Sequence, residues 1–278
     1  MEQRIITAEQ LIFFRRQLES EERSAATVEK YLREARQFSA WLGGEPVSKA
    51  AAARWKEQLL AAGCHPATVN GKLTALDRLL ALLGWGDCRV KHLKLQRRLF
   101  RERERELTGE EYRRLLAAAE REGRGRLALL MEAICATGIR VSEVKYLTVE
   151  AARAEIALKG KIRTILIPGK LCRKLLRYAR GQSIASGEIF LTRGGNSLSR
   201  KQIWADMKRL CRKAGVAPSK VFPHNLRHLF ARTFYRVCRD VAKLADVLGH
   251  SSIETTRIYL ISTGAEHARV LERLRLIS

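Results

Sequence analysis

Four segments in the second half of the chain carry residues suited to phosphate chemistry, and a tyrosine follows the last of them. The residues are Arg140 in ATGIRVSE, Lys159 and Lys161 in LKGKIR, His224, Arg227 and His228 in HNLRH, His250 in LGH, and Tyr259. Fixed cationic side chains stabilise the negative charge that builds on a phosphodiester during transfer. A tyrosine hydroxyl can attack phosphorus and form a covalent link, and a lysine can protonate the leaving oxygen. Together, these residues predict a site for phosphodiester cleavage.

Each residue also has an ordinary structural explanation. Arg140 has Glu143 three positions away as an ion-pair partner, and a single tyrosine in a helix is more often part of a core. Lysines in an exposed turn are usually inert. His224 and His228 have the spacing of zinc ligands, but no glutamate follows His224 and no third ligand is evident. We therefore expect no metal or other cofactor, with cationic side chains doing the work of magnesium.

The charge of the chain favours a polyanionic partner. Fifty-three lysines and arginines face twenty-nine aspartates and glutamates in 278 residues, a formal net charge of +24. Such a surplus destabilises the folded state by self-repulsion unless a polyanion neutralises it. Double-stranded DNA is the expected partner, although a basic protein associated with ribosomes has the same charge signature.

The remaining bulk features predict a cytoplasmic protein with no membrane partner. The longest apolar run, residues 127–136, is about half the length that spans a bilayer. The first ten residues lack the apolar centre of a signal peptide. Six cysteines occur without a C-x-x-C pair, which is typical of reduced, mostly buried thiols.

The elements that position these residues are mostly helical. Residues 1–100 contain four amphipathic helical patterns, which predict a compact bundle. The stretch 90–106 is charged and poor in apolar periodicity, and it indicates a connector, with the linker proper at 101–106. A second domain, 107–278, opens with the capping-box pair Thr108 and Glu111.

The second domain is expected to be mainly α with a small antiparallel β-sheet. Residues 154–168 hold two runs rich in β-formers around a glycine turn, which predicts a hairpin with Lys159 and Lys161 near its tip. The tail, about 263–278, places Val270, Leu271, Leu274 and Ile277 on one helical face. That face must dock on its own domain or on a neighbouring copy.

The order and spacing of these motifs over residues 107–260 resemble the tyrosine recombinase/integrase family, with Xer-type and transposon integrases nearest. The resemblance implies a four-helix, SAM-like core-binding domain followed by a mixed α/β catalytic domain. It implies a site-specific recombinase that cuts and rejoins DNA through a 3′-phosphotyrosine and a Holliday junction, without metal or ATP. The implied assembly is a homo-tetramer on two DNA sites, with an accessory directionality factor as a further partner.

Carried over residue by residue, the resemblance implies that Arg140 and Arg227 clamp the scissile phosphate. His224 and His250 would hydrogen-bond to that phosphate, and Tyr259 would be the nucleophile. Lys159 would be the general acid, with Glu143 as an acidic support.

One departure leaves the choice of lysine open, because the hairpin turn is one residue shorter than the KGNKxR pattern of Xer-like relatives. Lys159 is favoured over Lys161 because it leaves the first strand where that pattern's lysine does. Two other functions share parts of the sequence signature: a type IB topoisomerase, and a DNA-binding regulator that has lost catalysis.

Overall fold

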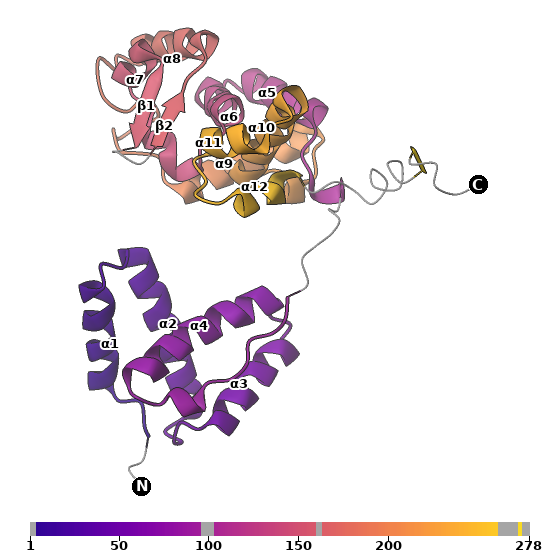
Figure 1. The fold of residues 1–278 in the computed structure, drawn as a ribbon. Helices are drawn as coiled ribbons and strands as arrows, with labels where there is room; N and C mark the ends of the chain where they lie inside the picture. Colours follow the sequence, from indigo (N-terminus) through magenta and orange to yellow (C-terminus); the bar gives the residue numbers. More distant parts are fainter. Residues whose placement is uncertain (1–3, 96–102, 160–162, 261–271, 274–278) are drawn as a thin grey trace. The chain divides into compact units, whose positions relative to one another are not determined.

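The computed structural model describes residues 4–95, 103–159, 163–260 and 272–273, and it divides the chain into two compact units (Figure 1). The units are Met1–Arg97 and Arg98–Ser278. Each unit has its own buried apolar core, so each is described by itself.

The described residues of the first unit, 4–95, form four α-helices. They are α1 (Ala8–Ser20), α2 (Ala25–Leu42), α3 (Lys49–Ala61) and α4 (Pro66–Leu82), followed by a 3₁₀ turn, η1 (Gly86–Cys88). Polar side chains cap their N-termini: Thr7, for example, accepts from the backbone of Gln10 and forms a capping box with it. Helix α2 packs against α1 and α4 (Figure 1), and Trp55, Phe38 and Leu73 are almost fully buried between the helices.

Part of the stretch predicted as a connector is packed against the units at either side. Val90 is buried in the first core, and Asn70 exchanges two hydrogen bonds with the backbone of Leu93. At the other end, the carbonyl of Arg105 accepts a hydrogen bond from the Asn225 side chain. The boundary between the two units, after Arg97, falls within the predicted connector 90–106, while residues near both of its ends contact the adjacent unit. The charged composition of this stretch does not reveal these contacts, because the peptide groups of Leu93 and Arg105 make them and not the charged side chains.

The second unit is a helical domain with one hairpin. Its elements are η2 (Arg103–Arg105), α5 (Gly109–Arg121), α6 (Gly125–Thr137), η3 (Val141–Tyr146), α7 (Val149–Ala154), β1 (Ile156–Lys159), β2 (Arg163–Leu166), α8 (Gly169–Gly181), α9 (Arg200–Ala214), η4 (Pro218–Lys220), α10 (Pro223–Cys238), α11 (Val241–Leu248) and α12 (Ile253–Leu260). The expected capping box of Thr108 with Glu111 begins α5, and a further one, Ser199 with Gln202, begins α9.

The two strands form an antiparallel pair beside α7 and α8 (Figure 1). Ile156 pairs with Leu166, and Lys159 pairs with Arg163. Beyond isolated bridges, the described residues hold no other strand pairing, so the chain is mainly helical.

The core of the second unit is built around α6, whose central residues are buried on nearly all sides. Helices α5, α8, α9 and α10 all pack against it. All six cysteines are free thiols, and burial raises the pKa of Cys135 to about 12. In the described residues, no helix is both long enough and apolar enough to cross a membrane.

Candidate active site

The tight turn after α6 positions the first arginine. Gly138 ends the helix with a φ of +64°, and a Cβ at this position would overlap the ring of Phe230. Both the left-handed backbone and the close packing therefore require glycine. Arg140 follows two residues later, and its backbone N–H donates to Oε2 of Glu143 at 2.8 Å.

Glu143 is fully buried and also accepts a hydrogen bond from the Arg140 guanidinium, 3.1 Å from Nη1 to Oε1. The side chain of Arg140 is 38% exposed. One buried carboxylate thus fixes both the backbone and the side chain of Arg140, while part of the guanidinium faces solvent. The pairing expected from the sequence is present, and it still allows the guanidinium to contact a phosphate.

Helix α10 positions the second arginine and two histidines. Pro223 occupies its first position, where a missing N–H costs nothing. Asn225 is buried and donates to the carbonyls of Arg105 and Lys220, which anchors the start of the helix. His224, Arg227 and His228 then lie on one helical face.

Arg227 is 1% exposed and holds together three separate parts of the chain. Its guanidinium donates to the carbonyl of Gly138, and to the carbonyl of Leu248 at 2.8 Å. Its Nε lies 3.3 Å from the hydroxyl of Tyr259. This arginine therefore joins the end of α6, the end of α11 and the tyrosine of α12.

His250 follows the end of α11, where Gly249 adopts a left-handed conformation with a φ of +62°. Its Nε2 lies 2.8 Å from Nη2 of Arg227, and its Nδ1 lies 2.9 Å from the hydroxyl of the buried Thr256. A guanidinium can only donate, so Nε2 is the acceptor of this hydrogen bond. His250 therefore links Arg227 to Thr256 of α12.

Tyr259 lies among three histidine rings and is 5% exposed. Its ring centroid is 4.3 Å from that of His228, 5.5 Å from His250 and 5.6 Å from His224. The ring also belongs to a small apolar cluster with Ala231, Leu244 and Leu248. The packing of α10, α11 and α12 thus directs the phenol hydroxyl at Arg227.

The structure brings together Arg227, His224, His250 and Tyr259, with His224 exposed at the surface of the site. Arg140 lies two residues after Gly138 in the chain, and the carbonyl of Gly138 accepts a hydrogen bond from Arg227. For Lys159 the structure describes the backbone, as the last residue of β1, and its side chain lies outside the described part. Lys161 lies outside it entirely, as does all of the tail except residues 272–273.

Sequence reasoning placed His228 on the helical face of His224 and Arg227 but did not place it against the tyrosine. His228 is 7% exposed, its ring is the nearest of the three to Tyr259, and it meets the ring of His224 at right angles. The i,i+4 spacing from His224 gave the shared helix face. It could not show that α12 would pack the tyrosine against that face.

We expect His228→Ala to slow DNA cleavage by about tenfold to a hundredfold, because Tyr259 loses the ring that fixes its orientation. The measurement is the rate of covalent adduct formation on a nicked duplex, with DNA affinity measured in parallel. His228→Phe keeps an aromatic ring at this position and should recover most of the rate. Thr233→Ala, at an exposed position of α10, is the control. A wild-type rate in the alanine variant would show that His228 has no positioning role.

The arrangement suits nucleophilic attack on a phosphodiester. It offers a hydroxyl beside a guanidinium, a second arginine held by a buried carboxylate, and histidines that can accept or donate protons. Among the described residues, no three histidine, cysteine, aspartate or glutamate side chains are grouped as metal ligands would be.

Comparison with known proteins gives a consistent result. The sequence model described as "Phage integrase family" matches residues 105–266. Tyrosine recombinase XerA of Pyrococcus furiosus is 30% identical over 290 residues, which cover 100% of this chain and 98% of that protein.

Two solved structures show the same fold. The Tn1549 transposon integrase in complex with transposon right end DNA matches with a TM-score of 0.74 at 17% identity, covering 97% of this chain and 99% of that one. The XerH site-specific recombinase bound to difH substrate matches with a TM-score of 0.66 at 18% identity, covering 97% of this chain and 90% of that one.

Proposed function

This chain belongs to the phage integrase family and is a tyrosine recombinase that acts on DNA, and we propose from this that it exchanges strands between two specific DNA sites through Tyr259. The strongest support for the proposal is the contact between Tyr259 and Arg227. The Tyr259 hydroxyl lies 3.3 Å from Nε of Arg227, so nucleophile and phosphate-binding group occupy one site. The relatives described as bound to transposon end DNA and to difH support duplex DNA as the substrate.

In the proposed reaction, the Tyr259 oxygen attacks the scissile phosphorus and the bond to the 5′ oxygen breaks. The products are a 3′-phosphotyrosine and a free 5′-hydroxyl, so the phosphoester bond is conserved and no ATP is needed. Attack by the 5′-hydroxyl of a partner strand reverses the step and rejoins the DNA. Two successive exchanges pass through a Holliday junction.

Arg140 and Arg227 stabilise the charge on the non-bridging oxygens, since both guanidinium groups are held by protein acceptors before reaction. Preorganised donors of this kind avoid the cost of reorientation as charge develops. Glu143 acts through Arg140 as a positioning residue.

His224 and His250 hydrogen-bond to the phosphate and help to move protons. The position of His250, whose Nε2 lies 2.8 Å from Nη2 of the phosphate-binding Arg227, supports this role. Lys159 protonates the 5′ leaving oxygen, with Lys161 as the alternative. Both lysines come from the hairpin, whose β1–β2 pairing places Lys159 opposite Arg163 at the turn end.

The assembly and domain roles form part of the same proposal. Residues 1–100 act as a core-binding DNA clamp of the SAM-like type, residues 101–106 as a linker, and residues 107–278 as the catalytic domain. Four protomers act on two DNA sites, and the tail helix, about 263–278, docks on a neighbouring protomer. An accessory factor sets the direction of exchange.

We expect cleavage of a nicked duplex to survive EDTA with a rate within about twofold of the untreated enzyme, because guanidinium groups supply the positive charge that a metal would otherwise provide. The measurement is the yield of protein–DNA adduct with time, with and without chelator. A requirement for added magnesium or zinc after chelation would contradict the mechanism.

The decisive test of function is a duplex with a nick next to the cleavage position, which traps the covalent intermediate because the short cut strand diffuses away. Relaxation of a supercoiled plasmid without a recombination site would instead favour a topoisomerase. DNA binding with no adduct on any duplex would favour a regulator.

A further inference from the structure

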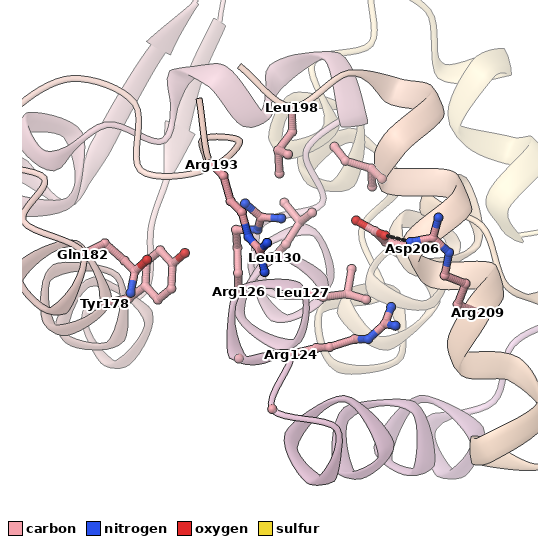
Figure 2. A pocket seen from close by; sticks show the side chains of 13 residues that line it. Arg124, Arg126, Leu127, Leu130, Tyr178, Gln182, Arg193, Leu198, Asp206 and Arg209 are labelled. Atoms are coloured by element: carbon pink, nitrogen blue, oxygen red, sulfur yellow. Dashed lines mark hydrogen bonds and ion pairs between the residues drawn. The ribbon is translucent and has the colours of Figure 1, made fainter. Parts of the chain in front are cut away.

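A cavity of about 590 Å³ lies in the second unit (Figure 2), and Tyr259 is not among the residues that line it. Its lining comes from the loop before α6, the end of α8, the segment 191–198 and α9. Helix α6 has this cavity at its first residues and Gly138 of the active site just after its last. Thirteen helical residues span about 20 Å, so the two sites lie at opposite ends of one helix.

The cavity is strongly cationic. Four arginines line it, Arg124, Arg126, Arg193 and Arg209, against a single acid, Asp206, which gives a formal charge of +3. Asp206 is paired with Arg209 at 2.9 Å. Figure 2 shows Arg124, Arg126 and Arg193 around the cavity, with the Asp206–Arg209 pair on the side of α9.

One of these arginines is bound to a backbone carbonyl, and another belongs to a tight turn. Arg126 donates to the carbonyl of Leu191. Arg193 sits in a tight turn closed by hydrogen bonds between Thr192 and Asn196, 2.7 Å from the Thr192 N–H to the Asn196 carbonyl. Guanidinium groups from different segments can bind one phosphate through several oriented hydrogen bonds, which a simple point charge does not offer.

The N-terminus of α6 adds backbone donors to the same cavity. Its N-cap residue, Arg124, makes no side-chain capping bond, and Gly125 and Arg126 of the first turn both line the cavity. Uncapped N–H groups and the positive end of the helix dipole attract an anion. Here they coincide with arginines contributed by other segments of the chain.

The floor of the cavity is apolar and aromatic. Leu127, Leu130 and Ile203 are buried beneath it, and the half-buried ring of Tyr178 forms one side. A cationic rim over an apolar, aromatic floor matches a phosphate attached to a flat organic group.

We propose that this cavity binds the phosphate of a nucleotide, with Arg124, Arg126 and Arg193 on the phosphate and the base or sugar against Tyr178 and the leucines. The phosphate belongs either to a DNA backbone or to a free nucleotide, since both present the same chemistry. The site is separate from Tyr259, and its occupation does not depend on the cleavage reaction.

The test compares two double variants of the full-length chain, Arg124→Gln with Arg193→Gln, and the control Arg177→Gln with Arg212→Gln. Both remove two positive charges from the second unit, and the control positions are exposed and outside the cavity. Leaving Arg126 in place preserves its bond to Leu191. Thermal unfolding of both variants checks that the fold is retained.

Two binding measurements distinguish the sources of the phosphate. With a fluorescent duplex, loss of a DNA phosphate contact should lower the log–log salt slope by about one for each contact, and only in the cavity variant. With fluorescent ATP, a free-nucleotide site should appear as at least about tenfold weaker binding in the cavity variant than in the control. Either result supports the proposal.

The proposal is overturned if the cavity variant and the control behave alike with both probes, because the effect would then be net charge alone. Both measurements can be made in a Tyr259→Phe background. Their outcome is therefore independent of whether Tyr259 is the nucleophile.

Discussion

Tyr259→Phe is expected to abolish covalent attachment to a nicked duplex while leaving DNA affinity nearly unchanged. The substitution removes one hydroxyl, the proposed nucleophile, and keeps the ring that packs between His228 and His250. The fold should also be retained, because the aromatic contacts of the small apolar cluster remain. The measurement is adduct yield on a denaturing gel beside a binding titration with the same duplex.

A matched control is Tyr235→Phe, which removes a hydroxyl from a tyrosine on α10 that packs against the same cluster. It should form adduct at the wild-type rate. Adduct formation by Tyr259→Phe at any substantial level would show that another residue attacks the phosphate.

Arg227→Lys is expected to lower the cleavage rate by about a hundredfold to a thousandfold, the usual cost of losing one oriented donor at a developing oxyanion. Lysine keeps the positive charge but cannot reproduce a fork that reaches Gly138, Leu248 and Tyr259 together. The carbonyls left without a donor should also lower the free energy of unfolding by about 1–3 kcal/mol.

Single-turnover cleavage and denaturant unfolding measure the two effects separately. Arg212→Lys, on the exposed face of α9, makes the same exchange outside the site and should change neither. A variant with lysine at position 227 that cleaves as fast as wild type would remove Arg227 from the mechanism, whatever its stability.

The features that could be predicted from the sequence are those that depend on residues a few positions apart. The capping boxes at Thr7, Thr108 and Ser199 depend on residues three positions apart, and all three are present in the structure. The Arg140–Glu143 pair depends on the same spacing and was also predictable. The shared face of His224, Arg227 and His228 needs only the period of a helix.

The contacts that assemble the site could not be read from the sequence. Arg227 binds the carbonyls of Gly138 and Leu248, which lie 89 and 21 residues away, and backbone acceptors carry no sequence signature. The placement of Tyr259 against His228 depends on how α12 packs on α10. The arginine cavity has the same origin, because its lining converges from separate segments that no linear motif connects.

The stretch 90–106 shows where side-chain polarity is a weaker guide. Its many charged side chains indicated a connector, and they gave no sign that Asn70 binds the backbone at Leu93 or that Asn225 binds the backbone at Arg105. Side-chain polarity describes what a segment prefers to expose. It does not describe which of its peptide groups a neighbouring amide can bind.

The most direct test of the proposed mechanism is to identify the amino acid to which the DNA becomes covalently attached. The trapped complex on a nicked duplex is digested with nuclease and trypsin, and the modified peptide is sequenced by mass spectrometry. Cleavage after Arg257 and Arg269 releases IYLISTGAEHAR, whose single tyrosine is Tyr259. We predict a nucleotide phosphate on Tyr259. A nucleotide on any other residue would contradict the assignment of Tyr259 as the nucleophile.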